Sequence, residues 1–561
     1  MADLETLLAE LSPERRRLLK LQLEKKKEAA NRAPVRRGRA EAPLSAGQSR
    51  LWFLDRLEPG SPRYNSPIAL RVRGPLDAEV LERALAEVVR RHEALRTVFR
   101  AGEGGEPVQV VQPAGAFSLA RQDLSGLDAE TREAEALRLA DVEARGPFDL
   151  SAGPLFRARL LRLGEGDHLL SLSMHHIVTD GWSMGVLFQE LGPLYEAFAR
   201  GEPSPLPELA IQYPDFAAWQ RETLSGEALE RPLAWWREAL AGAPEVLELA
   251  GDRPRPAEQS YRGGRVRVAL PHDLSERLRE VARGESATLF MLLLAAYDVL
   301  LWRWSGETDV VVGTPMAGRT RAEVEPLIGF FVNTLALRAD LSGDPSFREL
   351  LVRVRHATLG AFDHQELPFE RLVEALHPER SLSYAPVVQA LFALQTSLPT
   401  EFRLPGMETE SVRLAGSTVR YDLELLLWSR DEGITGTFEF AADLFDAATV
   451  ERMAAQYRRL LEGIAAAPDT PISALPLLDE AEAAMVVEVW NATSSAYPRD
   501  ATVPALFAEQ ARERADATAL VFGADRLTYA ELNARANRLA RVLRRRGVGP
   551  DTPVGLSAER S

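Results

Sequence analysis

The most regular hydrophobic pattern of the chain lies between residues 168 and 201. From His168 to Met174 apolar and polar side chains alternate, which is the pattern of a strand with one buried face. Apolar residues then recur at helical spacing, and a glycine at position 201 stands where a helix would stop. The recurring residues are Val186, Leu187, Leu191, Leu194 and Phe198. The pattern predicts a strand, a turn and a helix in succession.

Similar patterns continue in two successive blocks. Strands are predicted at 68–73, 265–270, 310–313 and 437–440, and helices at 80–89 and 289–301. Mixed elements in two blocks, 41–216 and 217–475, predict an α/β (α+β) protein with two lobes. We find no residue-level internal repeat between the blocks.

Both ends of the chain differ from this body. Residues 1–40 hold every lysine of the protein, and Ser12 followed by Pro13 is a suitable helix start. A linker helix and a docking element for an upstream protein both fit this first segment. Residues 476–561 form a further block, which begins with a junction around 481–505.

Composition narrows the class of protein. The 561 residues carry a formal net charge of −15, which disfavours binding to nucleic acid or to an anionic membrane. There are no cysteines, so disulfides and cysteine metal sites are excluded. The apolar run 289–302 is shorter than the ~20 residues of a membrane span and contains Asp298. Since no secretory signal opens the chain, we expect a soluble, cytoplasmic monomer.

The turn between the predicted strand and helix carries the candidate chemistry. His175 and His176 stand at the strand end, and Asp180 and Gly181 lead into the helix. Such loops are where a rigid scaffold often places reactive groups, and a neutral imidazole is a base near neutral pH. Adjacent strand residues point to opposite faces. The spacing alone therefore leaves a catalytic and a structural interpretation of the histidine pair open.

The motif His175-His176-x-x-x-Asp180-Gly181 resembles the active-site signature of nonribosomal peptide synthetase condensation domains, which belong to the chloramphenicol acetyltransferase-like superfamily. The resemblance covers residues 41–475. The sequence at 45–52 is similar to that of the condensation-domain subtype that joins two L-configured units. It implies two acetyltransferase-like lobes in a V-shaped pseudo-dimer with a tunnel between them. The further segments that resemble the family, in the same order, are 44–54, 59–61, 64–65, 91–99, 213–220, 328–334 and 364–370.

The resemblance also implies a reaction. The α-amine of a downstream aminoacyl thioester would attack an upstream acyl or peptidyl thioester. Both substrates would arrive on the 4'-phosphopantetheine of separate carrier proteins, an upstream donor and a downstream acceptor, so the chain would hold no cofactor of its own. His176 matches the catalytic histidine of the family, either as a general base or as a group that only orients the amine.

The resemblance assigns supporting roles to other residues. His175 would hold the loop from its opposite face, and Asp180 would form an ion pair with Arg319 of the second lobe. The Gly181 backbone amide is a candidate for stabilising the oxyanion. Trp182 and Ser183 are candidates for lining the tunnel.

Asn333 is a third tunnel candidate, which would present its amide to a substrate or satisfy a loop backbone. His364 and Glu366 lie close together in the sequence, but no further ligand has suitable spacing. We therefore expect no metal.

Two related activities stay as alternatives to peptide-bond formation. Epimerisation domains share the histidine motif but continue with other residues than Trp182-Ser183-Met184-Gly185. A coenzyme A-dependent acyltransferase of the same superfamily would lack carrier-type neighbours. A non-catalytic recruitment module is disfavoured by the intact His176 and Asp180.

Residues 527–537 resemble the first motif of adenylation domains. No phosphate-binding loop follows them before position 561, and an adenylating enzyme needs one to hold its nucleotide. We expect the truncated start of an adenylation domain here, with the rest of that domain as a partner in the full-length synthetase.

Overall fold

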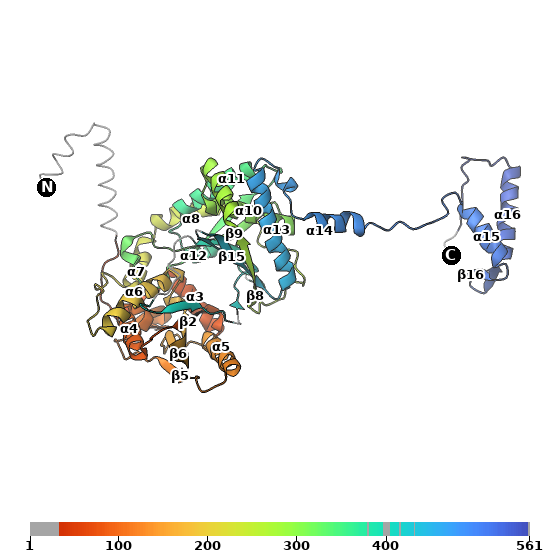
Figure 1. The fold of residues 1–561 in the computed structure, drawn as a ribbon. Helices are drawn as coiled ribbons and strands as arrows, with labels where there is room; N and C mark the ends of the chain where they lie inside the picture. Colours follow the sequence, from red (N-terminus) through yellow and green to blue (C-terminus); the bar gives the residue numbers. More distant parts are fainter. Residues whose placement is uncertain (1–32, 378–380, 396–403, 415–416, 431, 559–561) are drawn as a thin grey trace. The chain divides into compact units, whose positions relative to one another are not determined.

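The computed structural model describes residues 33–558, except 378–380, 396–403, 415–416 and 431. The chain divides into a large unit that ends at Leu478 and a small unit that begins at Asp479. The helix expected around Ser12 lies outside the described residues. Within the large unit, Figure 1 shows one lobe built mainly from earlier residues, in red to yellow, and a second from later residues, in green to blue.

A five-stranded sheet forms the first lobe, in the order β12-β2-β7-β6-β5. The pattern around position 175 is present as a strand and a helix, β7 and α6. The strands are β2 (Asn65–Arg73), β5 (Ala120–Asp123), β6 (Phe156–Gly164), β7 (Asp167–His175) and β12 (Glu408–Ser411). The helices are α3 (Ala46–Leu57), α4 (Ala78–Arg91), α5 (Ala129–Arg145), α6 (Gly181–Ala199) and α7 (Tyr213–Thr223). A small sheet, β1-β4-β3, accompanies them, with β1 (Glu41–Pro43), β3 (Thr97–Ala101) and β4 (Pro107–Val111).

Strand β7 is buried on both faces, whereas its alternating pattern predicted one buried face. One face packs in the core with α4 and α6. Helix α5 covers the other, where Ala136 and Ala140 cluster with Leu169. Ser171 and Ser173 are therefore buried too. The strand that leads to the histidines is held rigidly from both sides.

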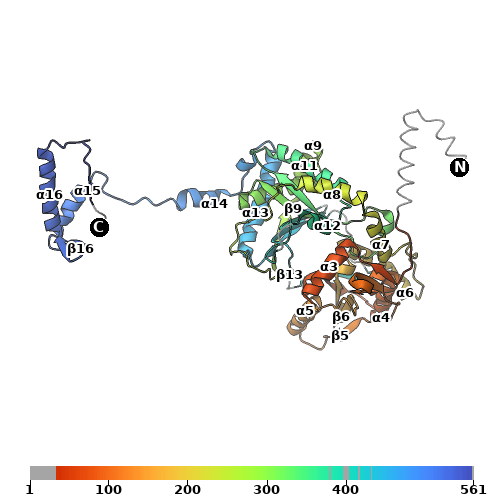
Figure 2. The same ribbon diagram turned by 180° about the vertical axis from the view of Figure 1, so that it is seen from behind.

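A seven-stranded sheet forms the second lobe, in the order β10-β9-β11-β14-β15-β8-β13. Its strands are β8 (Arg262–Leu270), β9 (Asp309–Met316), β10 (Asn333–Asp340), β11 (Ala390–Gln395), β13 (Ser417–Thr418), β14 (Leu423–Arg430) and β15 (Gly433–Ala441). Its helices are α8 (Glu227–Ala239), α9 (His272–Gly284), α10 (Leu289–Ser305), α11 (Phe347–Asp363), α12 (Phe369–Leu376) and α13 (Ala447–Ala466). Figure 2 shows α9, α11 and α13 in this lobe and α4, α5 and α6 in the other.

Helix α10 is the apolar run that the sequence placed in the core. Every residue from 291 to 301 is buried, Asp298 included, which confirms the prediction of a buried helix. No single helix in the described part of the chain is long and apolar enough to cross a membrane. The helices α9 and α10, joined at a sharp bend, reach the required length and apolar composition only when they are taken together.

The two lobes share a topology, as the pseudo-dimer implied by the family resemblance requires. In the first lobe β2, β7 and β6 are antiparallel neighbours, and in the second β8, β15 and β14 are the corresponding antiparallel neighbours. Helices α4 and α9 follow the first strand of each set, and α6 and α13 follow the middle one. The mixed α/β architecture with two similar lobes is as expected.

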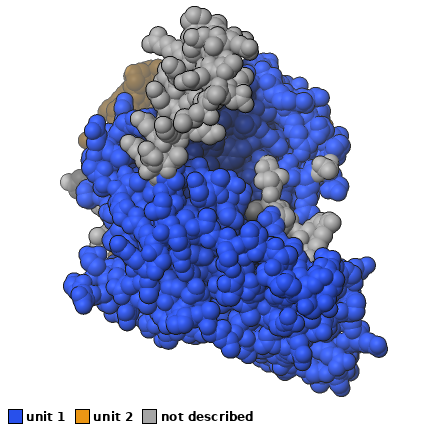
Figure 3. All heavy atoms as spheres, turned by 90° about the vertical axis from the view of Figure 1, so that its left-hand side faces the viewer, with its two compact units in different colours: residues 1–478 blue, residues 479–561 orange. Residues whose placement is uncertain are grey.

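The lobes are interlocked rather than separated at residues 216 and 217. Strand β12 leaves the second block of the chain and pairs antiparallel with β2 of the first lobe. Val324, Leu327, Ile328 and Phe331 likewise belong to the core of the first lobe. The boundary predicted between residues 216 and 217 divides the sequence into two blocks, but residues of the second block pack in the first lobe. Figure 3 shows that the surface of the large unit is deeply hollowed on one face.

The small unit contains short helices and a two-stranded sheet. Apolar side chains are exposed over it, among them Val521, Phe522 and Leu539. Its elements are α14 (Glu480–Ala484), a π-helical turn (Met485–Val489), α15 (Val503–Glu513), β16 (Thr518–Phe522), β17 (Asp525–Thr528) and α16 (Tyr529–Arg545).

Candidate active site

His175 ends β7 and holds the turn that follows it. Its Nδ1 accepts a hydrogen bond from the backbone N–H of Ile177 at 3.1 Å, at the start of the 3-10 turn His176–Val178. The side chain is buried, with the ring of Phe148 edge-on at 6.1 Å. Burial, with smaller contributions from His176 and Arg420, lowers the pKa of His175 to about 3. The imidazole is thus neutral, as an accepting Nδ1 requires.

His176 faces a cavity instead of the core. Its Nδ1–H donates to the carbonyl of Thr179 at 2.7 Å, which fixes the tautomer and leaves a lone pair on Nε2. The ring lies 5.0 Å from that of Phe330, at an interplanar angle of 73°. Burial and then the positive charge of Arg420 lower the pKa of His176 to about 4. Nε2 can therefore accept a hydrogen bond from a ligand throughout the neutral range of pH.

Gln48 supports the same turn from another segment of the chain. Its Nε2 donates to the carbonyl of Ile177 at 3.2 Å, and its Oε1 accepts from the backbone of Ser45. The sequence pointed to this segment only through the family resemblance. A polar residue inside an otherwise apolar helix face was the signal that could have identified the role.

Asp180 lies at the start of α6 and connects three parts of the site. Oδ1 accepts from the backbone N–H of Ser183 at 2.8 Å and pairs with Arg319 Nη2 at 3.2 Å. Oδ2 accepts from the backbone N–H of Phe331 at 2.9 Å. Both side chains of the ion pair are no more than 2% exposed. The structure thus brings together the two residues that the sequence analysis paired.

Arg319 is anchored on its other side by backbone carbonyls. Its Nη1 donates to the carbonyls of Val324 and Leu327, the second at 2.8 Å. Burial lowers the pKa of Arg319, and Asp180 opposes that shift. The pair consequently ties the loop before α6 to the segment that the second block sends into the first lobe.

Ser183 does not line a tunnel, contrary to the sequence-based expectation. Its side chain is buried. Its Oγ donates a hydrogen bond to Asp180 at 2.7 Å and accepts one from Nη2 of Arg319 at 2.8 Å. The backbone N–H of Gly329 also donates to this Oγ at 3.1 Å. In the first turn of α6, position 183 points back to its own cap, Asp180, so Ser183 belongs to the support of the loop.

Asn333 is held by a neighbouring loop. Its Nδ2 donates to the carbonyls of Gln365 and Leu367, and its Oδ1 accepts from the backbone N–H of Phe369, all within 2.9 Å. Of the two roles considered for this amide, the structure has the one in the loop. The residue lies beside a second cavity, of about 460 Å³.

The cavity that His176 faces has a volume of about 440 Å³. Gly181 and Trp182 line it, and Trp182 is fixed by a hydrogen bond from Nε1 to the carbonyl of Glu325 at 3.0 Å. A Cβ at position 181 would meet no atom within 4 Å, so packing does not require this glycine. Both lobes contribute to the walls.

Charged residues other than Asp180 in the walls of this cavity were not identified as site residues from the sequence. The most prominent are Arg420, just before β14, and Glu424, within β14. Burial and the neighbouring Glu439 raise the pKa of Glu424 to about 7, against the effect of Arg420. A glutamate among the leucines of residues 423–427 is the sequence feature that could have indicated a polar group in this wall.

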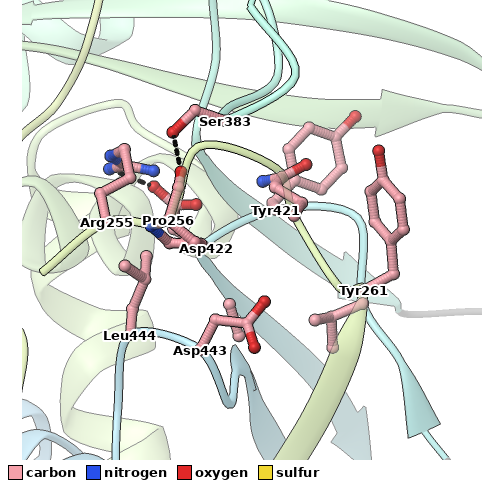
Figure 4. A pocket seen from close by; sticks show the side chains of 11 residues that line it. Arg255, Pro256, Tyr261, Ser383, Tyr421, Asp422, Asp443 and Leu444 are labelled. Carbon is pink, nitrogen blue, oxygen red and sulfur yellow. Dashed lines mark hydrogen bonds and ion pairs between the residues drawn. The ribbon is translucent and has the colours of Figure 1, made fainter. Parts of the chain in front are cut away.

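The corresponding junction of the second lobe lies between β15 and α13 and has no histidine. Asp443 and Leu444 line a cavity of only about 10 Å³ there, which is room for about one water molecule. Figure 4 shows Arg255 directed at Asp422 in this place, and the ion pair between them measures 2.7 Å. This junction has no space for a substrate.

The described residues contain no cluster of three or more histidine, cysteine, aspartate or glutamate side chains that could hold a metal ion. His364, which stood near Glu366 in the sequence, forms a hydrogen bond between its Nδ1 and the carbonyl of Gly360 at 2.9 Å and stacks on Trp235 at 4.4 Å. It packs as a structural residue.

Comparison with protein families gives two matches. A family model described as "Condensation domain" matches residues 39–487, and one described as "AMP-binding enzyme" matches residues 507–561. One of the linear gramicidin synthase proteins of Brevibacillus parabrevis is 47% identical over 94% of this chain, which covers 7% of that protein. Phosphinothricin tripeptide synthetase PhsC of Streptomyces viridochromogenes is 42% identical over all of this chain, which covers 52% of that protein. The chain thus spans about half or less of the length of these relatives.

Solved structures agree with these matches. The X-domain from teicoplanin biosynthesis is 33% identical and superposes with a TM-score of 0.73, over 80% of this chain and all of the other. The first condensation domain of the calcium-dependent antibiotic synthetase, in complex with a substrate analogue, is 26% identical with a TM-score of 0.66, over 78% and 99% of the two chains.

Proposed function

The chain belongs to the condensation-domain family of nonribosomal peptide synthetases, amide-forming acyltransferases, and from this premise we propose how its site forms a peptide bond. The α-amine of a downstream aminoacyl thioester attacks the carbonyl of an upstream acyl or peptidyl thioester beside His176. A C–N bond forms, the C–S bond breaks, the amine loses a proton and the upstream thiol leaves. The observation that supports this most directly is the lone pair of His176 Nε2 in a cavity of about 440 Å³.

His176 orients the amine rather than deprotonating a free ammonium ion. A histidine with a pKa of about 4 is a far weaker base than an α-amine with a pKa of about 7.7–8.0. Nε2 accepts a hydrogen bond from the neutral amine and points its lone pair at the thioester. As the C–N bond forms, the nitrogen becomes more acidic, and its proton then passes to Nε2.

The start of α6 stabilises the developing negative charge. The Gly181 amide opens the helix and lines the cavity, and amides in the first turn of a helix have no partner within it. His175, Asp180, Arg319 and Ser183 fix the position of this turn. Trp182 forms part of the wall.

Substrates reach the site on carrier proteins. The synthetase context implies phosphopantetheine on separate carrier domains, and we propose an upstream donor and a downstream acceptor as partners, with L-configured units on both. The adenylation domain that starts at 507 would load the downstream carrier. We further propose that the large unit works as a monomer in the cytoplasm.

The test loads an upstream and a downstream carrier with defined thioesters, adds the chain and follows dipeptidyl carrier by mass spectrometry. His176→Ala should slow the reaction about 10²–10⁴-fold and leave the fold intact, because the ring faces a cavity and its loss removes one hydrogen bond, to the carbonyl of Thr179. His272→Ala is the matched control, since this histidine is exposed at the start of α9. Epimerised aminoacyl carrier without dipeptide, or turnover of coenzyme A thioesters in place of carriers, would establish one of the two alternatives.

A further inference from the structure

Strand β14 places an acidic side chain in the wall of the active-site cavity. Its residues alternate, so Leu423, Leu425 and Leu427 are buried in the core of the second lobe. Glu424 and Leu426, on the other face of the strand, line the cavity together with His176. The carboxyl group and the imidazole thus bound the same space.

The neighbours of Glu424 compensate its charge only in part, through the positive charge of Arg420. On β15 the residue opposite is Glu439, which forms an ion pair with Arg265 of β8. Glu424 itself accepts a hydrogen bond from the backbone N–H of Arg420 at 3.2 Å. It forms no ion pair with any residue in the described ranges. Burial and the like charge on the next strand outweigh the effect of Arg420 and raise the pKa of Glu424, so an approaching cation would stabilise the carboxylate.

The other charged groups of the cavity wall have partners. Arg50 pairs with Glu370 at 3.5 Å, and Asp180 pairs with Arg319. Arg63 stacks on Tyr261 at 3.6 Å, and Arg420 lies over Tyr64 at 5.1 Å. The tyrosines in the wall, Tyr64 and Tyr421, carry phenol groups that can donate or accept hydrogen bonds. Glu424 is therefore the anionic group of this wall that a ligand can pair with.

We propose that Glu424 binds an ammonium group of the incoming acceptor and holds it in the cavity beside His176. The proposal rests on the proposed function, in which the acceptor is the substrate whose α-amine must lie beside His176. Two sources have this chemistry, the α-ammonium of every aminoacyl thioester and the side chain of a basic one. The amine becomes reactive once it loses its proton, and it is by then already placed at the site.

The pH window follows from the two groups. The pKa of Glu424 is raised to about 7, so the carboxylate is present above that pH and is lost as the pH falls through it. An α-ammonium persists only below a pKa of about 8. Preference for the charged ligand should therefore be greatest between about pH 7 and pH 8.

The experiment measures binding by calorimetry to the full chain, wild type and Glu424→Gln, with three pantetheine thioether mimics of the acceptor. The first carries an alanyl group, the second its α-hydroxy analogue, and the third an α-hydroxy analogue of lysine. Glu410→Gln is the matched control, because Glu410 lies on β12, exposed, and pairs only with Arg73. Thermal unfolding of each variant establishes that it folds.

We expect Glu424→Gln to weaken binding of the alanyl mimic about tenfold or more, a change of about 1.4 kcal/mol, and to leave the α-hydroxy mimic unchanged. If only the lysine analogue binds more weakly to Glu424→Gln than to the wild type, Glu424 binds a basic side chain of the acceptor. Equal affinities of wild type and variant for all three, or an equal loss for all three, would overturn the proposal. Formation of dipeptidyl carrier by the wild type tests the proposed function separately, so the two failures are distinct.

Discussion

At the scale of single residues, the site depends on one carboxylate that serves three segments. Asp180 caps α6, forms an ion pair with Arg319 and accepts a hydrogen bond from the backbone N–H of Phe331. A buried ion pair adds little net stability, but removing one partner leaves the other charge uncompensated. The position of the histidine turn therefore depends on the side chain of Asp180.

Replacing Asp180 by asparagine tests this dependence. Asn cannot accept from both Ser183 and Phe331 with the same geometry, and Arg319 would stay buried without a counter-charge, so we expect a loss of about 3–5 kcal/mol in the free energy of unfolding. Denaturant titration measures it. Asp128→Asn, at the exposed cap of α5, is the control, and an equally small effect in both variants would contradict the argument.

The low pKa of His176 makes a prediction about rate and pH. Because the imidazole stays neutral down to about pH 4, the decline of the rate on the acidic side should follow the acceptor amine. At saturating acceptor, a β-fluoroalanyl thioester, whose amine is less basic, should shift this decline to lower pH than an alanyl thioester. Single-turnover rates across the pH range measure the shift. Identical profiles would show that a protein group controls the decline.

Some of these residues could be predicted from the sequence and others could not. The contact between Asp180 and Arg319 follows from a motif whose residues are fixed in order. Ser183 was misplaced, and the two roles considered for Asn333 could not be separated, because the direction of a polar side chain depends on which backbone groups lie nearby. Glu424 was missed because an isolated charge in an apolar strand acquires meaning only when a cavity is found beside it.

At the scale of elements, the short strand β12 has a large effect on the architecture. It brings residues of the second block to the edge of the first sheet, next to β2. Its four residues, Glu408–Ser411, have no apolar alternation, so no pattern announced it. Strands such as β7 and β8 were predictable because their own side chains form the cores that they enter.

Val412→Pro tests the contribution of this crossing. The backbone N–H of Val412 donates to the carbonyl of Ala69 at 2.8 Å, and proline has no N–H to donate. We expect a loss of about 1–3 kcal/mol beyond that of Val412→Ala, which keeps the hydrogen bond. Urea unfolding of the two variants gives the difference. Equal stabilities would mean that the pairing of β12 does not hold the lobes together.

At the scale of the whole molecule, the first lobe does not complete its core from one block of the chain. Val324, Leu327, Ile328 and Phe331 fill the core of the first lobe although they come from the second block. The active-site cavity likewise takes walls from both lobes. The large unit thus behaves as one folding unit in spite of its two sheets.

A fragment of residues 33–216 should therefore fail to fold, whereas residues 33–478 should unfold in one cooperative transition. The short fragment lacks the buried side chains near position 328 and leaves β2 as an open edge, which promotes aggregation. Near-ultraviolet circular dichroism during heating distinguishes the two outcomes. A cooperative transition of the short fragment would refute the interlocked description.

The shared topology of the lobes gives the molecule an internal reference. After β7 the strand-to-helix junction carries an imidazole in a roomy cavity, and after β15 the same kind of junction carries Asp443 and a void the size of one water molecule. The backbone plan is common to both, so it cannot by itself account for catalysis. Each chain should consequently contain one reactive centre, and a stoichiometric inhibitor directed at the histidine should reach saturation at a single equivalent.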